Sequence, residues 1–313
     1  MKFLQLIRYK NLLLIALMQL IIRFGYLEQA IIEHKKIPLA LFYWQYTLLI
    51  LSTLLIAAGG YVINDIFDQE TDSHNKPKKT LIGTYFSETT AYNIYAGLTI
   101  AGVACGFILA HSVSHSNLSI LFVLIATLLY LYASSLKQIA IVGNILIAFI
   151  LAFSVIIIGI FDIYPNTFDI NQQQMTIAFS ILLDYAKFAF MLNLVREIIK
   201  DIQDVEGDKL QDMKTLPIII GIKKSNRIGF TLLLLTTLYI IYYSYVYIFL
   251  HNLNYSIIYL LLFVIAPMVF AMILIWNAEE KKDYKKISTL LKWIILFGIL
   301  SIWIITYNIK HHG

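Results

Sequence analysis

Two clusters of carboxylates have the residue types and the spacing for chemistry. They are Asp65, Asp68 and Asp72 and, with the same i, i+3, i+7 spacing, Asp201, Asp204 and Asp208. On a helix this spacing places three carboxylates on one face. Carboxylate oxygens without His or Cys nearby suit a hard cation, Mg²⁺ or alternatively Mn²⁺. Because Mg²⁺ completes its shell with substrate phosphate, two facing clusters indicate a diphosphate held between metal ions.

Basic residues flank both clusters, as a phosphate ligand requires. They are Lys76, Lys78 and Lys79 after the first cluster and Arg196, Lys200 and Lys209 around the second. Arg196 and Lys200 are spaced i, i+4, so on a helix they project together. We expect them to contact phosphate; the alternative is a helix-end pair that reaches toward lipid headgroups. A single DxxDxxxD motif often occurs by chance. Two copies flanked by basic residues favour a functional site over solvated loop charges.

The composition places these clusters in a membrane protein. The chain has 313 residues, of which 14% are charged, and its mean hydropathy is +0.76. A soluble domain carries about a quarter charged residues. Apolar runs of membrane-spanning length therefore predict an all-α polytopic membrane protein. The single cysteine, Cys105, excludes an intrachain disulfide and a thiolate metal cluster.

Nine spans are expected, and all are helical because the apolar runs are continuous rather than alternating. The predicted ranges are 10–27, 38–62, 88–110, 117–136, 139–161, 174–198, 226–250, 254–277 and 287–308. The N-terminal run lacks a small-residue cleavage site, and Arg23 interrupts it, so we interpret it as a retained first span. No segment is typical of a linker, which predicts one transmembrane domain over residues 1–313.

The distribution of Lys and Arg predicts the orientation. With the N-terminus in the cytoplasm, the basic segments at 2–10, 76–79, 137, 196–227 and 281–286 all fall on the cytoplasmic side. The other side receives only Lys35, Lys36 and Lys310. This bias follows the positive-inside rule. Both motif loops are then cytoplasmic and the C-terminus is outside. The net charge of +5 is explained by orientation, so we expect membrane lipids and no nucleic acid as partners.

The motif strings resemble those of the UbiA superfamily of intramembrane prenyltransferases. NDIFDQETD followed by NKP matches the first family motif, NDxxDxxxD, and KDIQDVEGDK matches the second, DxxDxxxD or DxxDxEGD. The resemblance covers the whole chain. It includes Asn11 and the segment YASSLKQIAIVGN, in which Tyr132, Lys137, Gly143 and Asn144 match a recurrent pattern. One departure is KPKKTL, where the family usually has Arg before Pro-Leu and where Lys79 stands instead.

The resemblance implies a fold, a reaction and a set of site residues. It implies a UbiA-type bundle of nine helices in which a polyprenyl diphosphate lies with its tail in an apolar tunnel. Mg²⁺ ions would join the diphosphate to the six motif aspartates. The allylic C–O bond would then break, and an acceptor would attack C1 of the resulting carbocation-like species. Residues expected to bind substrate are Asn64, Asn11, Lys76, Lys79, Tyr132, Lys137, Arg196 and Lys200.

The second motif bears on the acceptor. REIIKDIQDVEGDK resembles the branch of the superfamily that transfers a geranylgeranyl group to geranylgeranylglyceryl phosphate and forms an ether lipid. Prenyltransferases with aromatic acceptors, such as homogentisate or a quinone precursor, share DxEGD and are the alternative. The phosphate that Arg196 and Lys200 contact is then the acceptor's or the diphosphate's. The resemblance and the absence of a transit peptide imply a prokaryotic plasma membrane.

Other features leave further interpretations open. Asp184 and Lys187 form an i, i+3 pair inside the sixth span, either as a packing pair or as part of the tunnel. We expect Arg23 to reach the outer membrane interface rather than a site. A transporter would place its charges near the midplane, whereas these clusters lie at span ends. A non-catalytic binder of prenyl lipids is the third class.

Overall fold

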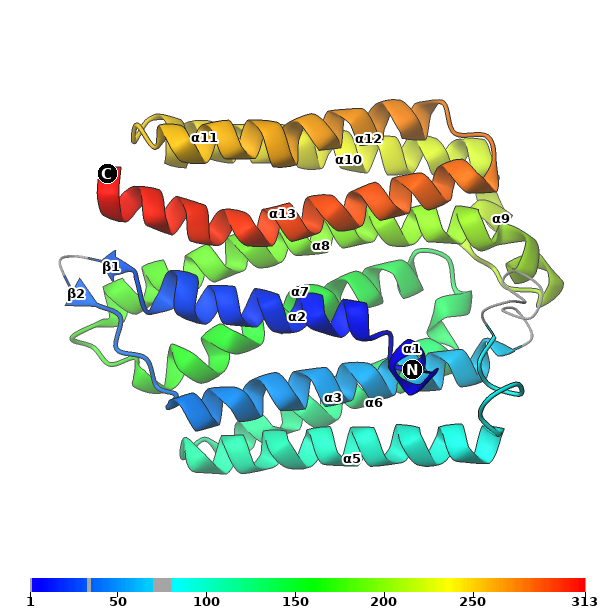
Figure 1. The fold of residues 1–313 in the computed structure, drawn as a ribbon, viewed down its shortest axis with the longest axis horizontal. Helices are drawn as coiled ribbons and strands as arrows, with labels where there is room; N and C mark the ends of the chain where they lie inside the picture. The colour runs from blue at the N-terminus through cyan, green and yellow to red at the C-terminus, as the bar shows by residue number, and fades with distance from the viewer. Residues whose placement is uncertain (1, 33–34, 70–79, 313) are drawn as a thin grey trace.

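The computed structural model describes residues 2–32, 35–69 and 80–312, and its long helices form one bundle (Figure 1). Within those ranges, nine helical stretches are long and apolar enough to cross a membrane, as predicted. They are α2 (Tyr9–Leu20) continued by η1 (Ile21–Leu27), α3 (Tyr43–Phe67), α5 (Glu88–Ser112), η3 (Ser116–Ser119) with α6 (Ile120–Ser134), α7 (Val142–Asp162) with η5 (Tyr164–Asn166), α8 (Gln172–Leu210), α10 (Ile222–Ser244) with η6 (Tyr245–Phe249), α11 (Asn254–Leu260) with η7 (Leu261–Ile265) and α12 (Ala266–Trp276), and α13 (Lys281–His312).

Short elements connect the spans. They are α1 (Lys2–Leu6), η4 (Leu136–Gln138), α9 (Leu216–Ile220) and an antiparallel pair of strands, β1 (Ile31–Ile32) and β2 (Lys35–Lys36). The strand pair is a correction, because the sequence was expected to form helices only. It is confined to a connection between spans, so the bundle itself is all-α.

Several helices have boundaries that differ from the predicted ones. α13 begins six residues earlier than predicted, at Lys281, and α10 begins four residues earlier, at Ile222. α3 begins five residues later, at Tyr43, because the preceding chain is extended: the backbone N–H of Ala40 donates to the Asp162 carbonyl at 2.9 Å. α8 continues to Leu210 instead of ending near residue 198. An apolar stripe explains this extension, since Ile198, Ile202 and Val205 are all buried at helical spacing.

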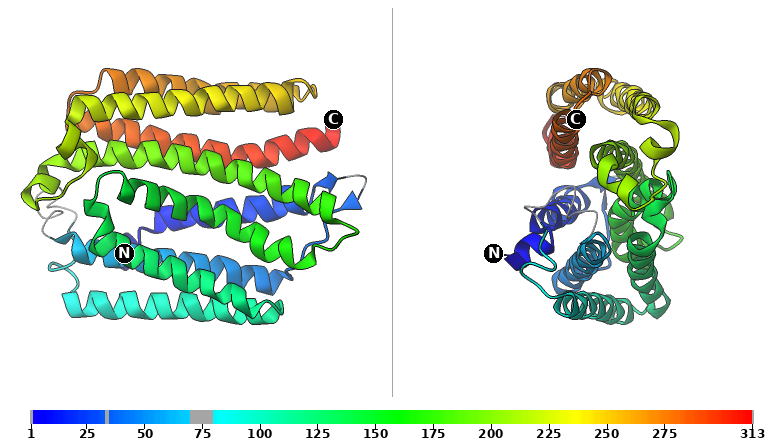
Figure 2. Two further views of the ribbon diagram at one scale, coloured as in Figure 1. Left: turned by 180° about the vertical axis from the view of Figure 1, so that it is seen from behind. Right: turned by 90° about the vertical axis from the view of Figure 1, so that its right-hand side faces the viewer.

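The helices pack in layers between two edges of the bundle. The end-on view in Figure 2 shows α10 and α12 at one edge and α5 at the other. Buried apolar residues form one large cluster that joins η1, α3, α7 and the first half of α8, and a second that joins the rest of α8 to α10–α13. Small residues permit α3 and α5 to approach closely: the Ser52 hydroxyl on α3 donates to the Gly102 carbonyl on α5 at 2.7 Å.

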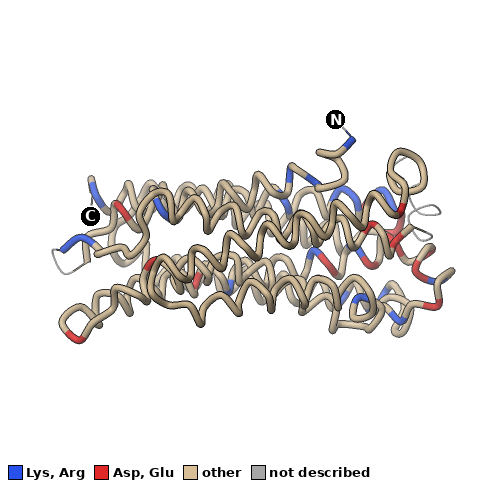
Figure 3. Tube along the Cα trace, turned by 90° about the horizontal axis from the view of Figure 1, so that it is seen from below, with Lys and Arg blue, Asp and Glu red and all other residues tan. Residues whose placement is uncertain are grey.

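The two ends of the bundle differ in charge. The N-terminus, the end of α3 and the end of α8 lie toward one end, and the C-terminus lies at the other (Figure 1). Figure 3 shows most acidic and basic residues gathered toward the N-terminal end. The grouping of the motif segments with the N-terminus is therefore as predicted. We call this the motif end.

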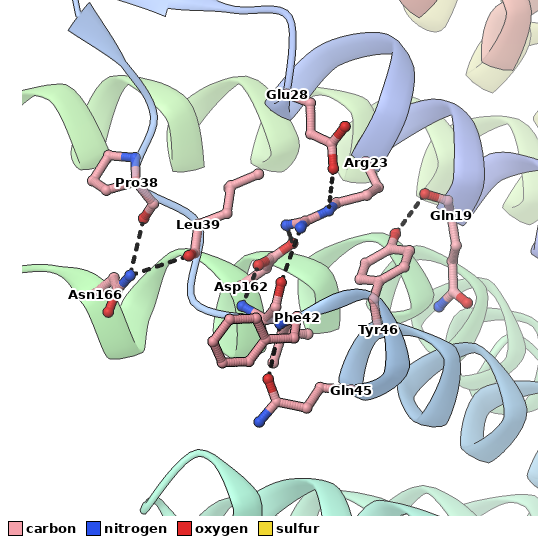
Figure 4. Close-up of polar contacts among 11 residues, drawn as sticks. Gln19, Arg23, Glu28, Pro38, Leu39, Phe42, Gln45, Tyr46, Asp162 and Asn166 are labelled. Carbon is pink, nitrogen blue, oxygen red and sulfur yellow. Dashed lines mark hydrogen bonds and ion pairs between the residues drawn. The ribbon is translucent and has the colours of Figure 1, made fainter.

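Arg23 corrects one expectation, because it does not reach the interface. Its side chain is only 5% exposed and forms ion pairs with Asp162, which is fully buried, and with Glu28, at 3.2 Å between Nε and Oε1 (Figure 4). The guanidinium also donates to the Leu41 carbonyl at 2.9 Å, and the Leu41 N–H donates to Asp162 at 2.9 Å. A buried charge needs such partners. This Arg23–Asp162 pair joins η1 and α7 to the extended chain before α3.

Candidate active site

The first acidic motif lies where α3 ends. Asp65 is in the last turn, and Asp68 follows directly after Phe67 and caps the helix through its N–H bond to the Asn64 carbonyl. The Asn64 side-chain amide donates to Asp68 at 2.5 Å. Asp65 forms an ion pair with Arg8 at 2.6 Å. Arg8 precedes α2, so this contact ties the start of the first span to the motif.

Arg8 had been noted only as an orientation signal. Partial burial by itself lowers the pKa of the Arg8 guanidinium, but the Asp65 carboxylate outweighs that effect and places the pKa above its ordinary value. Arg8 thus supplies a permanent positive charge beside the first motif.

The connection between α6 and α7 bridges the two motifs. Lys137, on η4, forms an ion pair with Asp68 of the first motif. Asn144, in the first turn of α7, donates to Asp201 of the second at 2.8 Å. Gly143 permits this tight arrangement, since a Cβ there would lie 2.8 Å from the Lys137 Cα. The recurrent Tyr…Lys…Gly-Asn pattern therefore has a physical role, which is to hold one residue against each motif.

The second motif lies entirely on α8, as the spacing predicted. Asp201 and Asp204 are half-buried, and Asp208 is 8% exposed and accepts a hydrogen bond from Thr215 at 3.4 Å. The chain that follows α8 returns to the bridging connection, because the Lys214 N–H donates to the Gln138 carbonyl at 2.9 Å.

Tyr132 lies between the two motifs. Its phenol is within electrostatic reach of Asp68 and of Asp201, and it lines an internal cavity with Asn64 and Lys200. Its predicted place at the site is consistent with this geometry.

Arg196 and Lys200 project together, but a third residue joins them. The Glu197 carboxylate accepts from Lys200 at 2.6 Å and from Arg196 at 3.4 Å. Sequence reasoning missed Glu197, although its i, i+3 spacing from Lys200 is typical of helical ion pairs. Both cations line an internal cavity, and their contact with phosphate stays a prediction.

Asn11 has a partner that the sequence did not indicate. Lys292, on α13, donates to the Asn11 side-chain oxygen at 2.5 Å. The two residues are 281 positions apart, and no local spacing connects them.

The donor set of the motifs fits a hard divalent cation. The motif side chains that the structure describes offer carboxylate and amide oxygens only, which Mg²⁺ prefers. In the described part of the chain, no group of three or more His, Cys, Asp or Glu is close enough to hold a metal ion. Asp65, Asp68 and Asp201 are instead bound by Arg8, Lys137 and Asn144. Asp72, Lys76 and Lys79 lie outside the described residues.

Two largely apolar cavities start at the motif end and share part of one wall. Cavity A lies between α2, α8, α10 and α13 and includes Asp184 and Lys292 among its lining residues. Cavity B lies between α3, α6, α7 and the motif end of α8 and includes Asn64, Tyr132 and Lys200. The residues common to both are Asn11, Ile15, Tyr61, Leu151, Ser154 and Arg196.

Asp184 lies at the wall of cavity A and pairs with Lys187. The two side chains form an ion pair at 2.9 Å, with Asp184 lining the cavity and Lys187 57% exposed. The pair is therefore both a local contact and part of the cavity wall.

Comparison with known proteins agrees with this geometry. Residues 31–296 match the model of the UbiA prenyltransferase family. The chain is 33% identical over 249 residues to a digeranylgeranylglyceryl phosphate synthase of Saccharolobus solfataricus, which covers 79% of each protein. A solved structure described as digeranylgeranylglyceryl phosphate synthase in membranes is 26% identical, with a TM-score of 0.60 and coverage of 96% of this chain and 98% of that one.

A more distant structure shares the fold. It is a UbiA homolog from Archaeoglobus fulgidus bound to DMAPP and Mg²⁺, 17% identical, with a TM-score of 0.56 over 96% of this chain and 99% of that one. The family match spans most of the chain and includes every described motif residue. The chain therefore belongs to the UbiA prenyltransferase family and is an integral membrane enzyme that transfers prenyl groups.

Proposed function

We propose that the enzyme transfers a geranylgeranyl group from geranylgeranyl diphosphate to geranylgeranylglyceryl phosphate. The free glycerol hydroxyl oxygen forms a bond to C1 of the donor, and the bond between C1 and the diphosphate oxygen breaks. The hydroxyl proton leaves with the departing diphosphate or passes to water. The products are an ether lipid with two prenyl chains and free diphosphate.

The observation that carries this proposal is the pair of cavities. The reaction brings together two molecules that each have a long apolar chain and a phosphate group. Cavity A and cavity B are both largely apolar, and their shared wall lies next to the basic residues of the motif end. An aromatic acceptor has no second chain that would need a separate apolar cavity.

Cavity B suits the donor because its polar end lies beside both motifs. Asn64 precedes Asp65, Lys200 precedes Asp201, and Tyr132 lies between the motifs. The diphosphate would lie against Lys137, Arg8 and Lys200, whose charges stabilise it as negative charge develops on the leaving group. The prenyl chain would extend past Phe122, Leu129 and Phe153, where the apolar walls exclude water from the reacting carbon.

Mg²⁺ is the cofactor that we propose, with Mn²⁺ as an alternative. The residues that would hold it are the six motif aspartates, Asp65, Asp68, Asp72, Asp201, Asp204 and Asp208, assisted by Asn64. When bound, it withdraws charge from the diphosphate and so favours its departure. Lys137 and Arg8 form ion pairs with two of these carboxylates and so reduce the repulsion between their like charges.

We further propose that the motif end faces the cytoplasm of a prokaryotic cell and that the C-terminus lies outside the plasma membrane. The excess of Lys and Arg at the motif end supports this orientation. The charged diphosphate head of the donor would then enter the site from the cytoplasmic side.

A transfer assay on the purified full chain tests the reaction. Radiolabelled geranylgeranyl diphosphate is offered with Mg²⁺ and with geranylgeranylglyceryl phosphate, homogentisate or dihydroxynaphthoate as the acceptor. We expect label on the glyceryl phosphate only, and none after chelation of the metal. Label on an aromatic acceptor would replace the proposed substrate and leave the prenyl-transfer chemistry intact.

Two isosteric variants test the motif assignment in the same assay. Asp68→Asn and Asp204→Asn remove one negative charge from each motif while they keep the side-chain shape. We expect each to lose nearly all Mg²⁺-dependent transfer while the protein stays folded. A matched control is Asp169→Asn, which lies in the connection before α8 at the end opposite to the motifs. Full activity in either motif variant would contradict the proposed metal site.

A further inference from the structure

Lys292 is a cation inside the bundle that no motif accounts for. It lies on α13, 11 residues after the helix starts at Lys281, roughly 16 Å along the axis. Its side chain is half-buried and lines cavity A together with Arg196 and Asn11. Its hydrogen bond to Asn11, at 2.5 Å, is to a neutral amide.

The charges around Lys292 do not balance in the described part of the chain. Two further cations, Arg196 and Lys10, act on it electrostatically, and among the described residues no carboxylate forms an ion pair with it. Lys200 differs, because Glu197 pairs with it at 2.6 Å. The carboxylate of Glu197 lies on the cavity B side of the shared wall, while Lys292 lines cavity A alone. A half-buried cation without a counter-charge favours binding of an anion at that place.

We propose that Lys292, Arg196 and Asn11 form a binding site for the phosphate monoester of the lipid acceptor, at the motif end of cavity A. This inference rests on the proposed function. It means that the acceptor phosphate and the donor diphosphate are bound by different cations. Arg196 supplies a planar fork, Lys292 a point charge and the Asn11 amide a neutral donor. Lys200 and Lys137 remain with the donor diphosphate on the other side of the shared wall.

This site also explains how the acceptor is oriented. With its phosphate at Lys292 and its prenyl chain in cavity A, the acceptor is fixed at both ends. The glycerol hydroxyl lies between those ends, beside the wall that Asn11, Tyr61 and Arg196 share with cavity B. C1 of a donor in cavity B would lie on the other side of the same wall, and such placement is itself a large part of catalysis.

Bulk anionic lipid offers the same chemistry, because its headgroups also carry phosphate. A lysine that only reaches for headgroups lies near the end of a span and points outward. Lys292 lines an internal cavity well inside α13, which favours the acceptor as the occupant.

The first experiment compares the kinetics of Lys292→Gln, Lys292→Arg and the parent, in nanodiscs of neutral lipid. The acceptors are geranylgeranylglyceryl phosphate and geranylgeranylglycerol, which lacks the phosphate. We expect Lys292→Gln to raise KM for the phosphate acceptor at least about tenfold, since a charged hydrogen bond is lost. KM for the diphosphate donor should not change, the preference for the phosphate acceptor should fall, and Lys292→Arg should restore most of it.

The matched control is Lys285→Gln, which removes an exposed charge from the same helix. We expect it to behave as the parent does. An equal rise in both KM values for Lys292→Gln, or an unchanged preference for the phosphate acceptor, would overturn the site. So would an effect of Lys292→Gln that occurs only in nanodiscs that contain phosphatidylglycerol, because bulk lipid would then be the ligand.

A binding measurement separates this site from the proposed reaction. Lysophosphatidic acid, which has one chain and a glycerol phosphate, should raise the thermal unfolding temperature of the parent more than that of Lys292→Gln. If the parent transfers no prenyl group to the glyceryl phosphate but keeps this difference, the proposed function fails and the phosphate site stands. If transfer occurs and the two proteins are protected equally, the site fails and the proposed function stands.

Discussion

Lys137 forms an ion pair with Asp68, although 69 positions separate the two residues in the sequence. The contact crosses from η4 to the end of α3, and it places a cation of the protein on a carboxylate proposed to bind metal. If Asp68 holds a metal ion as proposed, Lys137 would compete with that ion for the same carboxylate oxygen. The ammonium of Lys137 would also lie close to a diphosphate bound beside Asp68.

Replacement of Lys137 by Met should therefore lower two quantities, for different reasons. The Mg²⁺ concentration for half-maximal activity should fall, because no ammonium competes for Asp68. The value of kcat should also fall, roughly a hundredfold, because a charge that stabilises the leaving diphosphate is lost. A Mg²⁺ titration of steady-state transfer measures both. The control is Lys224→Met, an exposed lysine on α10. A higher requirement for Mg²⁺ in Lys137→Met would show that Lys137 assists metal binding instead.

Gly143 sets the shape of the connection that carries Lys137 and Asn144. In Gly143→Ala the new Cβ would lie 2.8 Å from the Lys137 Cα and 3.0 Å from the Leu136 carbonyl, so the backbone must move. We expect kcat to fall roughly tenfold to a hundredfold, since small displacements of a positioned group have such effects. Gly97→Ala on α5 is the matched control, because its Cβ would meet nothing within 4 Å. Equal transfer rates in the two variants would show that the connection tolerates displacement.

The long helices could be predicted from the sequence because each one is a continuous apolar run of neighbouring residues. Continuous apolar runs predicted nine spans, and each run has a counterpart in the structure. The extension of α8 was also predictable, since Ile198, Ile202 and Val205 repeat at helical spacing. It was missed because charged residues interrupt the apolar run after residue 198.

The contacts between helices could not be predicted, because they depend on which faces meet. Nothing near Arg23 in the sequence points to Asp162, which is 139 positions away. Asn11 and Lys292 come from the first and last spans. The resemblance placed Asn11 and Lys137 at the site, yet the partner of each became visible only in the fold.

The Arg23–Asp162 pair should dominate stability at the end opposite to the motifs. Arg23→Met leaves the Asp162 carboxylate buried without its counter-charge, which should lower the free energy of unfolding by about 3–5 kcal/mol. Asp162→Asn should be destabilising for the same reason. The double variant Arg23→Met/Asp162→Leu removes both charges and should recover most of the loss. Thermal unfolding in one detergent measures all of them, and additive losses in the double variant would contradict the coupling.

If each prenyl chain has its own cavity, a bulky residue in one cavity should affect only one of the two substrates. Two variants test this. Ala57 lines cavity B only and Ala189 lines cavity A only, and both are half-buried. Ala57→Phe narrows the proposed donor cavity, so KM for geranylgeranyl diphosphate should rise at least about tenfold, while the shorter geranyl diphosphate is affected less. Ala189→Phe should raise KM for the acceptor and leave KM for the donor unchanged. Each variant is the control for the other, because both introduce the same bulk at a cavity wall. The opposite pattern would exchange the two assignments, and equal effects on both substrates would mean that the chains share one cavity.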